Sequence, residues 1–212
     1  MATYDPRTPA TRPLGHVEFG PGLGPDADRR LLSDVRGKRV LDLGCGAGHT
    51  AVGLAQRGAR VLATDRDADQ LTAARALATT HEVTVEFHQA LPAELAFIRA
   101  DQIDVAVSVW ALSLVDDLDR VFRQVHRVLR TNGHAIVALP HPAALCADPV
   151  DPDRTTRSWE TTEPVGERFV HTVEDVVTAF TRTNFTVDTV LERHDGERVP
   201  ATLAVRARRV GA

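Results

Sequence analysis

The stretch from Val40 to Gly48, which reads VLDLGCGAG, constrains the fold of this chain more than any other segment. A short apolar run that carries Asp42 leads into a loop with glycine at positions 44, 46 and 48, and a helical run begins at His49. Glycine has no Cβ and tolerates a positive φ, so a ligand can lie against its bare backbone. The loop also delivers the first amides of a helix, which form a polar cradle. The pattern predicts a strand, a ligand-binding turn and a helix, although a tight structural turn would use the same glycines.

A second acid, Asp65, follows another apolar run at residues 60–64. It lies about twenty residues past the glycine loop, where an acid in this kind of sheet binds both ribose hydroxyls. A carboxylate suits a cis-diol because it accepts two hydrogen bonds at once. The alternative is that Asp65 caps the next helix, a role that Asp67 is also placed to fill. The sequence therefore favours a nucleoside site between the loop and Asp65.

Strand-like and helix-like segments alternate along the chain, as a doubly wound α/β sheet requires. The expected strands are residues 39–43, 60–64, 83–87, 103–109, 135–139, 185–191 and 201–207. The expected helices are residues 29–35, 49–57, 67–79, 118–130 and 172–183, with Asn132-Gly133 as a helix stop and Thr172 to Asp175 as a capping pattern. We expect a single domain over residues 1–212, since 212 residues suit one α/β domain with a sizeable core.

The composition argues against nucleic acid, metal ions and membranes as partners of this protein. The net charge is −4 with both signs mixed, which argues against a nucleic-acid partner. The two cysteines form no disulfide or metal pattern, and the nine histidines show no ligand spacing, so no metal is expected. The chain has neither an apolar run of membrane-spanning length nor a signal-peptide core, so we expect no membrane partner and a cytoplasmic location.

Three segments together resemble the class I S-adenosylmethionine-dependent methyltransferases. They are the glycine loop with Asp42, the run Asp104 to Ser108, and the segment from Val115 to His134. The resemblance implies a Rossmann-like seven-stranded sheet, mostly parallel with the last strand antiparallel. Leu139 to Ala143, with its Pro-His-Pro, is similar to a subgroup that methylates small molecules.

The resemblance also implies a set of residues that bind S-adenosylmethionine. The family often has an acid after the third strand to hold the adenine amino group, and Gln89 stands there, with a side-chain carbonyl that can accept the same hydrogen bond. The end of the fourth strand, at Ser108, faces the sulfonium in this family. The expected cofactor-binding residues are Asp42, Gly44, Cys45, Gly46, Gly48, Asp65, Arg66, Gln89, Ala90, Leu91 and Ser108.

Two irregular segments are expected to cover the acceptor. Residues 1–30 predict an N-terminal arm or lid, and residues 140–170, rich in proline, predict a substrate-cover loop over the carboxyl edge of the sheet. The expected substrate-binding residues are Phe19, Trp110, Trp159 and His171. Core packing is the alternative for Trp110, and a place just ahead of a helix cap is the alternative for His171.

His141 is the candidate general base. It follows a core strand at its carboxyl end, where ligands bind in open α/β sheets, and imidazole transfers protons near neutral pH. The alternative is a structural histidine, locked by the two prolines that flank it and bonded to the backbone.

These features predict transfer of a methyl group from S-adenosylmethionine to a small-molecule acceptor by in-line displacement. One alternative is a non-catalytic module that senses the cofactor or binds a partner, because the glycine loop and Asp65 serve binding alone. Another is a nicotinamide-dependent oxidoreductase. The loop spacing, Asp42 and the absence of a Tyr-x-x-x-Lys pair count against it. The acceptor, the methylated atom and the oligomeric state are not encoded in any pattern that we recognise.

Overall fold

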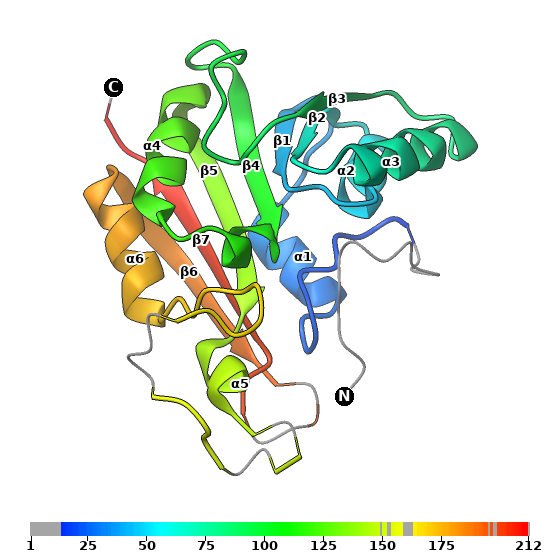
Figure 1. Ribbon diagram of the computed structural model, residues 1–212. Helices are drawn as coiled ribbons and strands as arrows, with labels where there is room; N and C mark the ends of the chain where they lie inside the picture. Colours follow the sequence, from blue (N-terminus) through cyan, green and yellow to red (C-terminus); the bar gives the residue numbers. More distant parts are fainter. Residues whose placement is uncertain are drawn as a thin grey trace.

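A computed structural model describes residues 14–148, 150–151, 154–158, 163–194, 196 and 199–211. Its centre is a seven-stranded sheet in the order β3-β2-β1-β4-β5-β7-β6 (Figure 1). The strands are β1 Arg39–Leu43, β2 Arg60–Asp65, β3 Val85–Gln89, β4 Ile103–Val109, β5 Leu129–Pro140, β6 Phe185–Arg193 and β7 Thr202–Arg209. The helices are α1 Pro25–Leu32, α2 His49–Gln56, α3 Ala68–Thr80, the short 3-10 helix η1 Ala111–Leu114, α4 Leu118–Val128, α5 Pro142–Cys146 and α6 Val173–Arg182.

The order of the strands creates a switch point beside β1. This strand pairs in parallel with β2 on one side and with β4 on the other, so the winding of the chain reverses between β1 and β4. Ligands of open α/β sheets bind at the carboxyl ends of the strands next to such a reversal. At the other edge, β7 runs antiparallel to both β5 and β6. The predicted seven-stranded sheet with an antiparallel last strand is confirmed.

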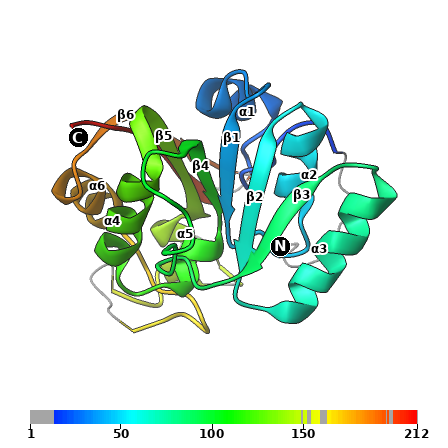
Figure 2. The same cartoon turned by 90° about the horizontal axis from the view of Figure 1, so that it is seen from above.

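Helices cover both faces of the sheet (Figure 2). Because neighbouring residues of a strand point to opposite faces, Val40 packs with α1, α2 and α3, whereas Leu41 packs with α4 and α6. On the second face, the rings of Phe122 and Phe180 stack with centroids 4.0 Å apart. Burial on both faces explains why the central strands are nearly continuous apolar runs.

Several predicted boundaries were wrong. The predicted helix 118–130 ends at Val128, and Asn132 does not stop it but lies inside β5 with a φ of 65°. The chain extends from Leu129 because that residue already pairs with Ile103 of β4, and the register then shifts before it resumes at Val105. Strand β3 begins two residues later than expected, at Val85, and α1 occupies residues 25–32 rather than 29–35.

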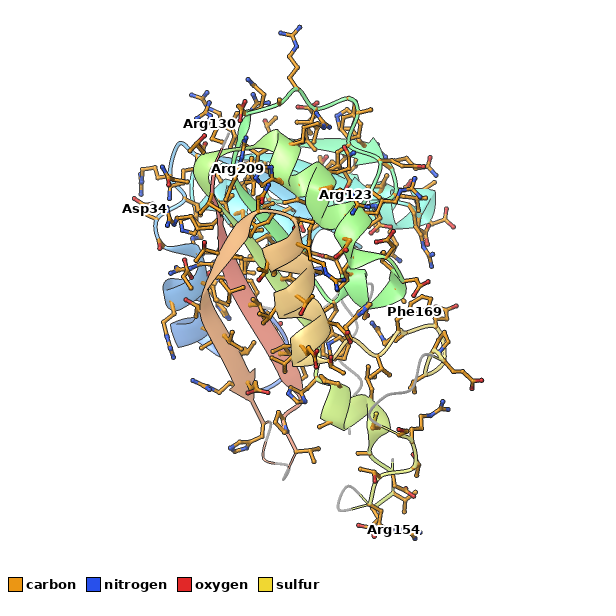
Figure 3. The ribbon with its side chains drawn as sticks, turned by 90° about the vertical axis from the view of Figure 1, so that its left-hand side faces the viewer. Asp34, Arg123, Arg130, Arg154, Phe169 and Arg209 are labelled. Carbon is orange, nitrogen blue, oxygen red and sulfur yellow. The ribbon has the colours of Figure 1, made fainter. Side chains whose placement is uncertain are left out.

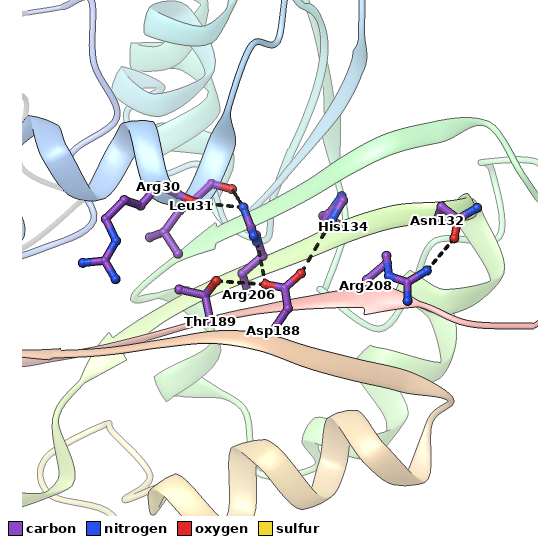
Figure 4. Close-up of polar contacts among 8 residues, drawn as sticks. All are labelled: Arg30, Leu31, Asn132, His134, Asp188, Thr189, Arg206 and Arg208. Carbon is purple, nitrogen blue, oxygen red and sulfur yellow. Dashed lines mark hydrogen bonds and ion pairs between the residues drawn. The ribbon is translucent and has the colours of Figure 1, made fainter.

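An ion-pair network ties the N-terminal helix to the antiparallel edge (Figure 4). The Arg206 guanidinium of β7 donates to the carbonyl oxygen of Arg30 at 2.8 Å and to that of Leu31 at 3.4 Å. The same guanidinium contacts the Asp188 carboxylate of β6 at 2.7 Å. Since the last carbonyls of a helix lack partners within the helix, Arg206 both caps α1 and joins it to the sheet.

None of the helices within the described ranges combines the length and the apolar character needed to cross a lipid bilayer.

Candidate functional site

A cavity of about 100 Å³ opens at the carboxyl ends of the strands around the switch point. Loops that follow β1, β2, β3 and β4 all contribute to its wall, and one residue comes from the distant excursion after β5. The lining residues are Gly44, Gly46, Asp65, Arg66, Asp67, Gln70, Ala90, Leu91, Pro92, Trp110, Ala111, Leu114, Val115 and Arg168. Seven of these belong to the expected cofactor or substrate set, so the structure brings that part of the prediction together.

The glycine loop is held between the neighbouring strand and two helices. The amides of Gly44 and Cys45 both donate to the carbonyl oxygen of Thr64, at 2.8 and 2.9 Å. A Cβ on Gly44 would lie 2.1 Å from the Cβ of Ala111, and a Cβ on Gly48 would lie 2.7 Å from that of Ala74. Both glycines have positive φ, and each allows a neighbouring element to approach the loop closely. Gly48 begins α2 and packs away from the cavity.

Asp65 is fixed by two backbone amides. Its Oδ2 accepts from the Gly46 amide at 2.8 Å, and its Oδ1 accepts from the Asp67 amide at 2.9 Å. The cap of α3 is Asp67, which accepts from the Asp69 amide at 2.8 Å. Asp65 is therefore not the helix cap that the alternative interpretation proposed. Each carboxylate oxygen has a further lone pair, and the residue lines the cavity. This geometry is compatible with ribose binding, which stays a prediction.

Asp42 is a buried acid directly behind the loop. Its side chain is sealed from solvent, and its Oδ2 has no hydrogen-bond partner among the described residues. Burial, and to a smaller extent the Asp65 carboxylate, raises the pKa of the Asp42 carboxyl to about 8, although a hydrogen bond from the Ala51 amide opposes the shift. The buried Cys45 thiol also has a pKa raised by burial, which makes it inert as a nucleophile.

Some of the residues expected near the adenine line the cavity, and others only support it. Ala90 and Leu91 line the cavity, as does Arg66. Gln89 donates its amide hydrogen to the Arg66 carbonyl oxygen at 3.1 Å, which leaves the acceptor oxygen of its side chain available for the predicted role. Ser108 does not line the cavity. Its buried hydroxyl donates to the Leu43 carbonyl oxygen at 2.9 Å and fastens β4 to β1 at the switch point.

Trp110 forms the wall beyond β4. Its φ of 63° turns the chain sharply at the end of the strand, and the residue lines the cavity. The guanidinium carbon of Arg168 lies 5.2 Å from the centre of that ring. A Cβ on Gly20 would lie 2.7 Å from the indole nitrogen, so the N-terminal arm passes close behind the tryptophan.

The end of the long excursion returns to η1 and is fastened there. Arg168 donates to the Ser113 hydroxyl at 2.6 Å, and the Phe169 amide donates to the Ser113 carbonyl oxygen at 2.7 Å. Figure 3 labels Phe169 on the segment that leads into α6. No sequence pattern indicated Arg168, because a single arginine in an aperiodic stretch follows no spacing.

His171 and Phe19 do not line the cavity. The His171 Nε2 lies 2.8 Å from the Val115 carbonyl oxygen, and burial lowers the pKa of this imidazole. Phe19 is completely buried in the core below α1 and α2. These contacts favour packing and anchoring roles over acceptor binding for both residues. Trp159 lies outside the described residues.

Both ring nitrogens of His141 are engaged. The Nδ1 accepts from the Ala143 amide at 3.1 Å, which caps α5, so the proton lies on Nε2, 2.8 Å from the Glu192 carboxylate. The side chain is buried and does not line the cavity. This geometry favours the structural alternative, because a base needs a free lone pair within reach of the acceptor.

No cluster of three metal-ligating side chains occurs among the residues whose structure is described.

Comparison with known proteins points to one family. Residues 41–137 match the model of a methyltransferase domain family. A ubiquinone biosynthesis O-methyltransferase from Alkalilimnicola ehrlichii is 34% identical over 107 residues, which are 50% of this chain and 43% of that protein. The match thus spans less than half the length of that relative.

Solved structures extend the likeness over most of the chain. An S-adenosylmethionine-dependent methyltransferase from Mesorhizobium loti has a TM-score of 0.73 and 28% identity, covering 85% of this chain and 95% of that one. The 1,6-didemethyltoxoflavin-N1-methyltransferase of Burkholderia thailandensis, solved with S-adenosylhomocysteine, has a TM-score of 0.61 and 19% identity over 83% of this chain and 72% of that one. Residues 41–137 therefore match a methyltransferase domain family, and the chain has the fold of the class I S-adenosylmethionine-dependent methyltransferases, as the resemblance predicted.

Proposed function

We propose that the protein transfers a methyl group from S-adenosylmethionine to a small-molecule acceptor. The observation that carries this proposal is the cavity at the switch point, where Gly44 and Gly46 meet Asp65. The bare glycine backbone of the loop and the carboxylate suit a nucleoside, and the tryptophan wall beyond β4 leaves the other side for an acceptor.

The residues of this site bind and orient rather than react. S-adenosylmethionine supplies a methyl group on a positively charged sulfur that is already activated for attack. Gly44 and Gly46 give the cofactor a wall without side chains, and Asp65 accepts hydrogen bonds from its ribose. Holding the acceptor in line with the methyl–sulfur bond then contributes on the order of 7–11 kcal/mol.

The acceptor is covered by the excursion after β5. Arg168, Phe169 and His171 anchor its far end on η1, next to the cavity. A cover of this kind excludes water from the methyl-transfer chamber. Both cysteines are buried free thiols, which suits the reducing cytoplasm that we propose as the location.

A non-catalytic cofactor sensor remains the second candidate, because the glycine loop and Asp65 would serve it equally well. Turnover separates the two. Incubation with labelled S-adenosylmethionine and a panel of small acids, phenols and amines releases labelled product and S-adenosylhomocysteine only from an enzyme.

Calorimetric titration tests the cofactor assignment. We expect S-adenosylmethionine and S-adenosylhomocysteine to bind more tightly than NAD. Asp65→Ala removes two charged hydrogen bonds and lowers the affinity by about 2–4 kcal/mol. Asp69→Ala, an exposed acid on the first turn of α3, is the matched control and retains affinity. Equal affinities in a folded Asp65→Ala variant would remove the ribose role.

A further inference from the structure

A group of basic side chains lies on the face of the sheet that α1 covers. His134 of β5 stands directly opposite Arg208 of β7 in the antiparallel register, so both side chains point to the same face (Figure 4). Arg206 lies two residues earlier on β7, and Lys38 directly precedes β1. His134 also pairs with Val105 near the start of β4, so the group lies toward the amino ends of the parallel strands, away from the cavity. We call Lys38, His134, Arg206 and Arg208 the basic cluster.

The positive charges of the basic cluster are only partly neutralised. Among the described residues, Asp188 of β6 is the one carboxylate that influences the His134 imidazole, and it already contacts the Arg206 guanidinium at 2.7 Å. The Arg208 guanidinium donates to a neutral acceptor, the side-chain oxygen of Asn132, at 2.7 Å. Two cations thus have one acid between them, and that acid is engaged.

Lys38 adds a third cation to this face. Its ammonium group forms no hydrogen bond or ion pair with any residue whose structure is described. The residue is half-buried, as are the other three members of the basic cluster, so their charges are screened less than those of fully exposed side chains. The chain as a whole has a net charge of −4, so this local excess of positive charge does not follow from the composition.

The His134 imidazole responds to the surrounding charges. Burial lowers its pKa, and the positive charges of Arg206, Lys38 and Arg208 lower it further. Asp188 opposes them, but its carboxylate lies 3.7 Å from Nε2, too far for a hydrogen bond. Helix α1 presents only its last carbonyl oxygens to this region, and Arg206 binds them. The ring is therefore neutral at pH 7 and gains a proton when a negative charge is added beside it.

We propose that the basic cluster binds a doubly charged oxyanion, such as a phosphoryl group, at a site separate from the cavity at the carboxyl edge. Ammonium, guanidinium and imidazolium groups are donors with no competing acceptor, and together they match several oxygens of such an anion. The anion supplies negative charge to Lys38 and Arg208, and His134 takes up a proton as it binds. This inference goes beyond the proposed methyl transfer and does not rest on it.

An NMR titration with sulfate tests the inference. Sulfate keeps both charges over the pH range in which imidazole titrates, and the ring signals of His134, assigned by their loss in His134→Gln, report on the site. We expect sulfate to shift these signals at about millimolar concentration, and to bind about three- to tenfold more tightly at pH 5.5 than at pH 7.5. Sodium chloride at the same ionic strength is the control for screening, and equal shifts with both salts would overturn the inference.

Matched variants separate a site from the overall charge. Lys38→Met and Arg208→Met each remove one cation of the basic cluster, and each is expected to weaken sulfate binding about 3- to 10-fold. Asp188→Asn removes the opposing acid and is expected to strengthen it. The control is Arg123→Met, because Arg123 is an exposed residue of α4 on the opposite face of the sheet, labelled in Figure 3. If Lys38→Met and Arg123→Met weaken binding equally, only the overall charge matters and the inference is wrong.

Two further titrations identify the ligand and the place of binding. Inorganic phosphate and glycerol phosphate carry the same group, so equal affinities indicate a free ion, whereas tighter binding of the ester indicates a phosphoryl group carried by a larger molecule. Failure of both to shift the His134 signals would contradict the inference. Sulfate affinity is expected to stay unchanged when S-adenosylhomocysteine is present, because no member of the basic cluster lines the cavity. Displacement of sulfate by S-adenosylhomocysteine would overturn the separate site.

Discussion

Replacing Asp42 by asparagine is expected to stabilise the free protein. The carboxyl pKa rises from 3.8 to about 8 on folding because burial disfavours the charged form. At pH 7 the unfolded chain is ionised and the folded chain is protonated, so folding must take up a proton. The free-energy cost is the gap between pH 7 and the unfolded pKa, about 4 kcal/mol at 1.36 kcal/mol per unit.

The pH dependence has a definite sign. Since the folded state binds more protons between the two pKa values, stability falls as pH rises from about 4 to about 8. Asparagine has no such titration. Its amide retains an acceptor for the Ala51 N–H, and an unpaired buried donor costs about 1–3 kcal/mol at every pH. The net gain at pH 7 is therefore about 1–3 kcal/mol, and it shrinks or reverses at pH 5.

Urea unfolding of both proteins at pH 5 and pH 7 measures the effect. The difference in the free energy of unfolding between variant and wild type is expected to grow by about 3 kcal/mol from pH 5 to pH 7. Asp69→Asn, on the exposed first turn of α3, is the control and shows no such change. Parallel pH curves for wild type and Asp42→Asn would refute the argument, because they would mean that Asp42 is ionised in the fold.

Other substitutions test the remaining contacts. Gly44→Ala is expected to lower the free energy of unfolding by about 2–4 kcal/mol, because the added Cβ overlaps Ala111 and the residue has a positive φ. Ala111→Gly in the same chain is expected to recover only the part of this loss that is due to the overlap. A double-mutant cycle on urea unfolding curves measures that part. His141→Gln is expected to lower the melting temperature and leave the pH–rate profile unchanged, and a rate loss of 10²–10⁴-fold at unchanged stability would restore the base assignment. Limited proteolysis is expected to cut residues 140–170 more slowly when S-adenosylhomocysteine and an acceptor are present, and equal rates would count against a cover.

The positions of the glycine loop and of Asp65 were predictable from the sequence because backbone geometry constrains them. A loop between a buried strand and a helix that packs against η1 and α3 needs glycine at 44 and 48, and this need is visible as a spacing. Asp65 stands at the end of the next strand, so its distance along the chain is also set by the fold. Such regularities can be recognised in the sequence without any knowledge of tertiary contacts.

The boundaries that were wrong depend on tertiary pairing. Strand β5 begins at Leu129 because β4 offers a partner there, and the local sequence, with Asn132-Gly133, favours a helix stop instead. The short helices α5 and η1 contain too few residues for a period to be recognised. Local preference and long-range pairing disagree at these places, and the pairing decides the structure.

The wall of the cavity beyond β4 depends on contacts that no spacing encodes. Arg168 reaches the cavity because Ser113 and Trp110, more than fifty residues earlier in the chain, hold it there. His141 had the more suggestive sequence position, at a strand end between two prolines, yet its nitrogens are occupied by Ala143 and Glu192. A strand end brings a residue near the site, but hydrogen bonding decides whether its lone pair is available. Chemical assignment on this face of the sheet therefore requires the partners of each side chain, because the position of a residue in the sequence does not show whether its lone pair is already engaged.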